Sequence, residues 1–266
     1  MTVGESIEES KPSIHLSLAG ADMDVSDALS AAEAAGAESL AIPGSWLEDG
    51  VFEEAEERLR RFEVLEAADI APSSVSSNVP GQTPAIVDAF VEKMSTMLER
   101  AARIGAESVT LSLGEPRIAG ESGSWEAKVG LLKRVAPFLR RNGVNLRLPL
   151  RIPRVGGGSS LAEWAALVRE SMSPDIGIEL RIHPHESGGG TPPEGLEGAF
   201  LLLVGSASFV FEPEMGNSLS PKLLRQWFDA FDAPVFDGAV FARPRVTSMA
   251  ALESALSALK GPFALM

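Results

Sequence analysis

The clearest concentration of side chains suited to proton transfer lies between positions 176 and 186, which hold two of the three histidines in the chain. Apolar and polar side chains alternate from Ile176 onward, with Glu179, Arg181 and His183 on the polar side. A period of two is typical of a β-strand whose two faces meet different surroundings. His185 and the glycine-rich segment 187–193 follow, so the polar side of the strand leads into a loop. The same pattern is expected of a half-exposed strand whose polar face only meets water, and this is the alternative interpretation.

Other short apolar stretches alternate in the same way, and the sets of polar side chains on their second face include further acids and bases. These sets are His15 with Ser17; Ser108, Thr110 and Ser112; Asn145, Arg147 and Arg151; and Ser208, Glu212 and Glu214. The opposite positions are nearly all Leu, Ile, Val or Phe. Because cysteine and tyrosine are absent from the chain, His, Asp, Glu, Lys and Arg are the candidates for acid–base chemistry.

The elements that would position these residues alternate along the chain. Strands are predicted over 14–18, 39–42, 63–68, 108–113, 145–152, 176–186, 208–214 and 234–242. Helices are predicted over 24–35, 53–61, 84–104, 125–141, 161–172, 195–204, 221–231 and 248–260. Eight successive strand–helix units favour parallel pairing and an α/β fold of the (β/α)8 TIM-barrel type. We expect residues 13–266 to form a single barrel domain after a disordered acidic N-terminus, 1–12.

In such a barrel the apolar strand faces pack under the helices, so the polar faces must point into the lumen. Buried charges are costly unless they pair with one another or bind a ligand. One interpretation is an internal ion-pair network, with Arg147 or Arg181 on Glu179. The residues predicted nearer the carboxyl ends of the strands, where barrel active sites lie, are the better functional candidates. They are Arg151, His183, His185, Glu212 and Glu214.

Composition narrows the classes of function. The formal charge of −14 and the pI near 4.7 argue against a nucleic-acid-binding surface. No apolar run approaches the roughly 20 residues of a membrane span, and the acidic N-terminus lacks the signature of a signal peptide. We therefore expect a cytoplasmic protein that binds a small molecule, with no nucleic-acid or membrane partner; a homo-oligomer or a partner subunit is compatible with the sequence.

Three segments resemble the xylose isomerase-like barrels, which include sugar phosphate isomerases and epimerases. The segments are 90–94, 102–109 and 178–185, in a chain with eight βα units of matching length. The resemblance implies a TIM barrel in which a Glu, an Asp, a His and a second Glu at the ends of the later strands hold a divalent metal. This chain departs from that pattern, because Arg151 stands near the end of the fifth strand without a Glu, and the eighth strand has Asp237 without a His-x-Asp motif.

The resemblance implies an isomerase or epimerase that acts on a sugar or another polyhydroxylated, anionic small molecule. Glu212, Glu214 and His183 are the predicted catalytic residues, and His183, His185, Glu212 and Glu214 the predicted ligands of a divalent Mn, Zn, Co or Fe ion; no nucleotide cofactor is expected. The predicted substrate-binding residues are Arg151, Arg181, Glu179, His15 and Trp46. Two alternatives stay open: a metal-free pseudoenzyme barrel that serves as a binding or partner subunit, and a metal-independent lyase that uses the arginines alone.

Overall fold

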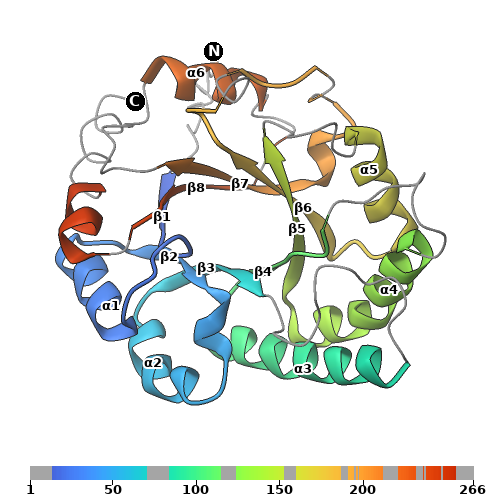
Figure 1. The fold of residues 1–266 in the computed structure, drawn as a ribbon, viewed down its shortest axis with the longest axis horizontal. Helices are drawn as coiled ribbons and strands as arrows, with labels where there is room; N and C mark the ends of the chain where they lie inside the picture. Colours follow the sequence, from blue (N-terminus) through green and yellow to red (C-terminus); the bar gives the residue numbers. More distant parts are fainter. Residues whose placement is uncertain are drawn as a thin grey trace, which may run out of the picture.

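The structure is a computed structural model that describes residues 14–70, 84–114, 124–152, 160–186, 191–194, 196, 198–211, 221–231, 236, 238–246 and 248–255. Within these residues eight strands, β1 to β8, close into a barrel in chain order, and each neighbouring pair is parallel. Figure 1 looks along the barrel and shows the helices as an outer ring. The prediction of a single TIM barrel is confirmed.

The strands differ in length, from four residues in β1 and β4 to eight residues in β3, β5 and β7. Their bounds are β1 Ile14–Ser17, β2 Ser39–Pro43, β3 Glu63–Ile70, β4 Ser108–Leu111, β5 Asn145–Ile152, β6 Ile176–Ile182, β7 Val204–Phe211 and β8 Ala239–Pro244. The pairing of β5 with β6 runs over seven successive residue pairs from Leu146↔Ile176 to Ile152↔Ile182. This regular register places Arg151 directly beside Arg181.

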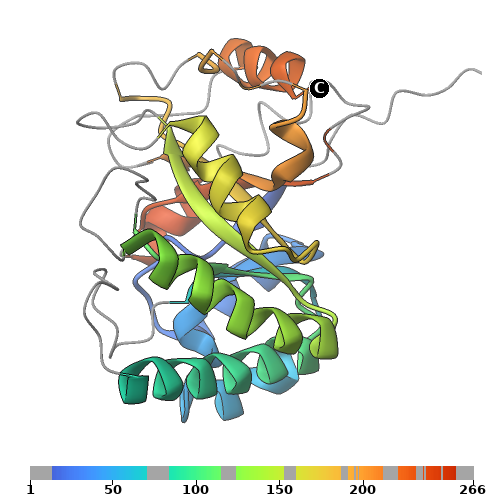
Figure 2. The same ribbon diagram turned by 90° about the vertical axis from the view of Figure 1, so that its right-hand side faces the viewer.

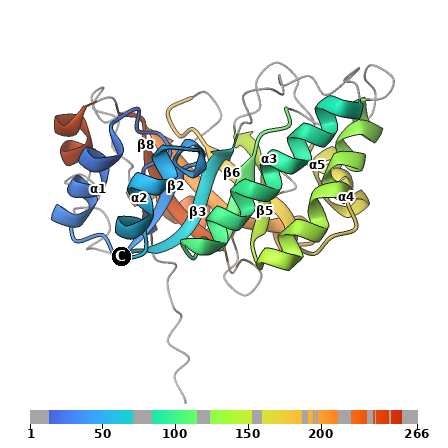
Figure 3. The ribbon, with the colours of Figure 1, turned by 90° about the horizontal axis from the view of Figure 1, so that it is seen from below.

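The helices alternate with the strands as the sequence predicts, except between β6 and β7. Their bounds are α1 Val25–Ala34, α2 Val51–Leu59, α3 Pro84–Arg103, α4 Ser124–Asn142, α5 Leu161–Glu170 and α6 Pro221–Ala230, with 3-10 turns η1 Gly44–Leu47 and η2 Leu201–Leu203. Residues 249–255 are also helical. Figures 2 and 3 show α3 and α4 lying side by side on one flank of the barrel, with α5 beyond α4. No helix in the described part of the chain is long and apolar enough to cross a membrane.

The alternation in β5 shows why the sequence adopts this arrangement. Leu146, Leu148, Leu150 and Ile152 are each at most 2% exposed and belong to the core between strands and helices. Their neighbours in sequence point the other way and are only half-buried or exposed. Burying one face of each strand under amphipathic helices removes apolar surface from water, and it leaves the polar face for the lumen.

Two predicted elements differ from the structure. The helix predicted over 195–204 is wrong, because only the 3-10 turn η2 forms there and Val204 already pairs with Ile178 as the first residue of β7. The apolar run 200–204 therefore leads into a buried strand, which short apolar runs do not distinguish from a helix. The eighth strand begins at Ala239 rather than at 234 and extends to Pro244, beyond the predicted end at 242.

Candidate active site

A cavity of about 420 Å³ opens at the carboxyl ends of the strands. Four guanidinium groups line it, from Arg151 on β5, Arg181 on β6, and Arg243 and Arg245 at the end of β8. The remaining lining residues are Ala19, Gly20, Asp69, Ser112, Pro149, His183 and Val210. Parallel strands end at the same edge of a barrel, so residues far apart in sequence converge here. We call this cavity the mouth.

Asp69 joins two of these guanidinium groups at the base of the mouth. Its Oδ1 accepts from Arg181 Nη1 at 2.6 Å, and its Oδ2 contacts Arg243 Nη2. Asp69 has φ +62°, a left-handed conformation that Asp adopts more readily than most residues, at the irregularity between Ala67 and Ile70 in the pairing of β3 with β4. Burial opposes the ionisation of Asp69, but the two arginines outweigh it and hold the pKa of the carboxyl below its ordinary value.

Glu179 extends this ion-pair network below the mouth. Its side chain is fully buried and contacts Arg181 Nε at 2.7 Å, Arg243 Nη1 at 3.6 Å and the Ser208 hydroxyl at 2.7 Å. Arg181 keeps its charge although it is buried, because Glu179 and Asp69 raise the pKa of its guanidinium. The internal ion pair between Arg181 and Glu179, one of the two interpretations of the sequence, is therefore present in the structure.

Glu66 on β3 lies deeper in the lumen and is 1% exposed. Its Oε2 is hydrogen-bonded to the Ser206 hydroxyl across the barrel at 2.9 Å. Burial, and then the nearby charge of Glu179, raise the pKa of Glu66 to about 8. At neutral pH this carboxyl is therefore predominantly protonated, and it adds no negative charge to the lumen.

A second, more exposed group of side chains forms the rim of the mouth. Arg151 Nη2 contacts Glu186 Oε1, and the same oxygen lies 3.5 Å from His183 Nδ1. Burial, followed by the positive charge of Arg151, lowers the pKa of His183 to about 4. His183 is therefore a neutral imidazole at pH 7, able to accept a proton or a hydrogen bond.

The structure brings some predicted site residues together and separates others. Arg151, Arg181 and His183 line the mouth, with Glu179 beneath them. His15 does not: its Nδ1 is hydrogen-bonded at 2.5 Å to Ser39 Oγ, at the beginning of β2 and therefore at the opposite end of the barrel. Trp46 is 4% exposed and packs in the hydrophobic core.

Apart from His183, the structure describes only His185 among the predicted ligands and catalytic residues that follow β6 and β7. His185 is exposed in the turn after β6 and is not among the residues that line the mouth. Glu212 and Glu214, and Asp237 near β8, lie outside the described residues.

Sequence reasoning missed Glu66, Asp69, Arg243 and Arg245. The two acids lie in the third strand, where the register shift at Leu40/Ala41 and the irregularity before Ile70 break strict alternation. The two arginines lie beyond the predicted end of the eighth strand at 242. Continuing the period of two past that point, through positions 241, 243 and 245, would have placed both on the lumenal face.

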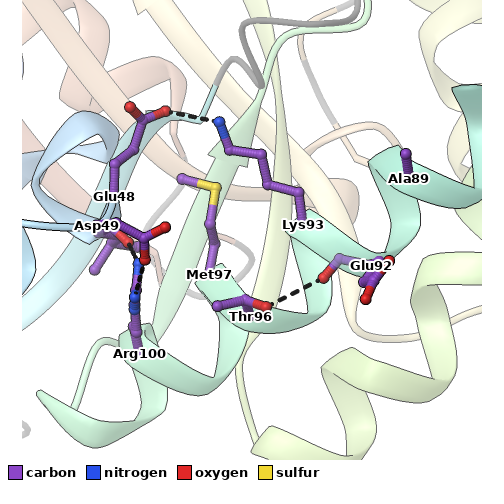
Figure 4. A pocket seen from close by; sticks show the side chains of 9 residues that line it. Glu48, Asp49, Ala89, Glu92, Lys93, Thr96, Met97 and Arg100 are labelled. Carbon is purple, nitrogen blue, oxygen red and sulfur yellow. Dashed lines mark hydrogen bonds and ion pairs between the residues drawn. The ribbon is translucent and has the colours of Figure 1, made fainter.

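Another cavity, of about 550 Å³, lies on the outside of the barrel between η1 and α3. Figure 4 shows Lys93 reaching toward Glu48 and Arg100 toward Asp49. Lys93 Nζ is 3.1 Å from Glu48 Oε1, and Arg100 contacts Asp49. No strand residue in the described part of the chain lines this outer cavity, whereas barrel active sites lie at the carboxyl ends of the strands, so we assign the functional site to the mouth.

The closed parallel barrel and the position of the mouth define a TIM barrel with the fold of the xylose isomerase-like sugar isomerases and epimerases. Solved structures with this fold include 3-keto-D-glucoside 4-epimerase from E. coli, with TM-score 0.68 and 13% identity over 95% of this chain and 99% of that one. The IolI protein with a binding zinc atom has TM-score 0.68 and 14% identity over 95% and 98% of the chains. D-psicose 3-epimerase with D-tagatose from Clostridium cellulolyticum H10 has TM-score 0.65 and 14% identity over 92% of this chain and 96% of that one. No protein-family model and no curated protein sequence matches the chain.

The described side chains do not fit the divalent metal that the resemblance implies. No group of three or more His, Asp or Glu side chains in the described ranges could hold a metal ion. The carboxylates nearest the mouth, Asp69, Glu179 and Glu186, are each already bound by arginine. A divalent cation would also meet four guanidinium groups, which repel it.

Proposed function

We propose that this chain is an enzyme of the sugar isomerase or epimerase type, and that its substrate is a polyhydroxylated small molecule with a carboxylate or phosphate group. The observation that supports this proposal is the mouth itself, in which four guanidinium groups line one cavity at the carboxyl ends of the strands. Guanidinium groups match the planar geometry of carboxylate and the oxygens of phosphate, and barrel active sites lie at this end.

In the proposed reaction, a base removes a proton from the carbon next to a carbonyl group, and negative charge develops on the carbonyl oxygen. Arg181 and Arg243 suit the stabilisation of that charge, because Asp69 fixes both guanidinium groups in place before the substrate arrives. Fixed donors need little reorganisation during the reaction, so they stabilise the transition state more than mobile ones do.

His183 is proposed as the proton partner. Its imidazole is neutral at pH 7 in the unliganded protein, since burial and Arg151 lower its pKa. A neutral imidazole at this position can accept the proton that the substrate releases, while Arg151 binds the acidic group of the substrate. Glu212 and Glu214, which follow β7 and lie outside the described residues, remain the proposed carboxylate bases.

Solvent proton exchange followed by NMR tests this function. The protein in D₂O is incubated with sugar acids, sugar phosphates and neutral sugars, with and without added Mn, Zn, Co or Fe. We expect deuterium to enter at the carbon next to the carbonyl in an anionic sugar only, and Glu212→Gln to abolish the exchange while the circular dichroism spectrum is unchanged. Exchange retained in Glu212→Gln would refute the role of Glu212, and no exchange with any sugar would refute the isomerase proposal.

A binding or partner subunit without catalysis is the second candidate. It is favoured by the pairing of Asp69, Glu179 and Glu186 with arginine, which leaves none of the three as a ready base. Anion binding without proton exchange would support this function. Cleavage of a substrate bond in the absence of metal would instead support the metal-independent lyase.

A further inference from the structure

Glu186 holds an unusual position for a carboxylate at the rim of a cationic cavity. It follows β6 in a turn closed by a hydrogen bond from its own amide to the carbonyl oxygen of His183, at 3.1 Å. Its side chain turns back toward the mouth, where Oε1 contacts Arg151 and lies 3.5 Å from His183 Nδ1. One oxygen atom thus contacts both a guanidinium group and the imidazole proposed for proton transfer.

The ion pairs of the mouth divide into a buried group and an exposed one. Arg181 and Arg243, whose side chains are 16% and 8% exposed, both contact Asp69 and Glu179, so removing either carboxylate would leave two buried guanidinium groups on a single carboxylate. In the pair of Arg151 with Glu186, the two side chains are 43% and 36% exposed. Exposed ion pairs contribute little to stability and exchange readily with other ions.

We propose that Glu186 occupies the place of the ligand's acidic group, so that a carboxylate or phosphate binds on Arg151 beside His183 by displacing the Glu186 side chain. This inference rests on the proposed function in that it assumes an anionic ligand. With Glu186 displaced, Arg151 no longer contacts that carboxylate, while Arg181 and Arg243 keep Asp69 and Glu179, so the mouth carries more positive charge. The excess of positive charge suits an anion, and the site needs no divalent metal to bind it.

Isothermal titration calorimetry tests the displacement directly. Inorganic phosphate and D-gluconate serve as probes at constant ionic strength with EDTA present, and D-glucose serves as the neutral control. Glu186→Gln removes the competing charge and nearly preserves the shape of the side chain. We expect it to bind at least one anionic probe about two- to five-fold more tightly than the natural chain, the range that an exposed ion pair predicts. Whether phosphate, gluconate or both respond identifies the acidic group preferred.

Two further variants separate displacement from a general change in charge. Glu57→Gln makes the same charge change at a side chain that is 90% exposed on α2, and it should leave both affinities unchanged. In an Arg151→Ala background, Glu186→Gln should no longer tighten binding, because the guanidinium for which the two anions compete is gone. A similar gain in both backgrounds would overturn the proposal.

The proposal would also be overturned if Glu186→Gln and Glu186→Ala bound the anionic probes no more tightly than the natural chain. It would be overturned equally if neither probe bound to any variant. Tight binding of Zn²⁺ in a separate titration without EDTA, lost in Glu186→Gln, would show that the carboxylate is a metal ligand and would overturn the proposal as well. The outcome is independent of the isomerase proposal, since proton exchange is not measured in the titration. Anion binding with the expected response but no proton exchange would support displacement and refute only the isomerase function.

Discussion

Replacing Glu66 by glutamine should stabilise the protein by an amount that grows with pH. Glu66 is 1% exposed, and its pKa is raised from an ordinary 4.5 to about 8. Below pH 4.5 the folded and unfolded states both hold the proton. As the pH rises toward 8, the unfolded chain loses the proton while the folded protein keeps it, so the free energy of unfolding falls across this range.

The size of this effect follows from the two pKa values of Glu66. Each pH unit between them corresponds to a tenfold change in the proton equilibrium, so the loss is less than about 1 kcal/mol at pH 5 and about 3 kcal/mol at pH 7. Glutamine has no proton to release at that position and avoids the loss. The free energy of unfolding of Glu66→Gln, minus that of the natural chain, should therefore rise by roughly 2 to 3 kcal/mol from pH 5 to pH 7.

Urea denaturation of both proteins at pH 5, 6, 7 and 8 measures that difference. Any fixed cost from altering the hydrogen bond with Ser206 shifts all points equally and leaves the slope unchanged. Glu57→Gln, whose side chain is 90% exposed, is the control and should follow the natural chain at every pH. Parallel pH profiles for Glu66→Gln and the natural chain would refute the conclusion that Glu66 is protonated in the folded protein.

Four other substitutions test the packing and the ion pairs. Gly238→Ala should lower the free energy of unfolding by about 1–3 kcal/mol, because its Cβ would lie 2.5 Å from the backbone carbonyl oxygen of Gly205. Gly130→Ala, in α4 with no atom within 4 Å of the added Cβ, should raise it by about 0.5–1 kcal/mol. Equal effects of the two substitutions in urea denaturation would contradict the close approach of Gly238 to β7. Trp227→Ala should lower the free energy of unfolding by about 3–5 kcal/mol, because it leaves a cavity under α6. A thermal unfolding midpoint equal to that of the natural chain would disprove this prediction. Asp69→Asn should lower the free energy of unfolding by about 1–3 kcal/mol, which is less than for a fully buried ion pair because the Asp69 side chain is 37% exposed. The same substitution should tighten the binding of phosphate, and weaker phosphate binding would argue against a cationic mouth.

The sequence by itself determined the order of the eight strands and the polar character of the lumen. In β5 and β6 the period of two is unbroken, so the lumenal faces of Arg151, Arg181 and Glu179 follow from alternation alone. Eight alternating strands and helices then leave a parallel barrel as the compact arrangement that buries the apolar faces. The ion pair of Arg181 with Glu179 needs only that both lie two residues apart on one face.

The tertiary structure decided which residues meet across the barrel. Asp69 reaches Arg181 and Arg243 through an irregular β3 in which Asp69 itself has a positive φ, and neither feature has a signature in the sequence period. His15 has the same alternation as the mouth residues, yet it lies at the beginning of its strand and pairs with Ser39 at the far end. Alternation specifies which face of a strand a side chain lies on. Register, bulges and barrel closure specify how deep that side chain lies along the barrel axis. These features depend on contacts between strands that are distant in sequence, so the period of two does not reveal them.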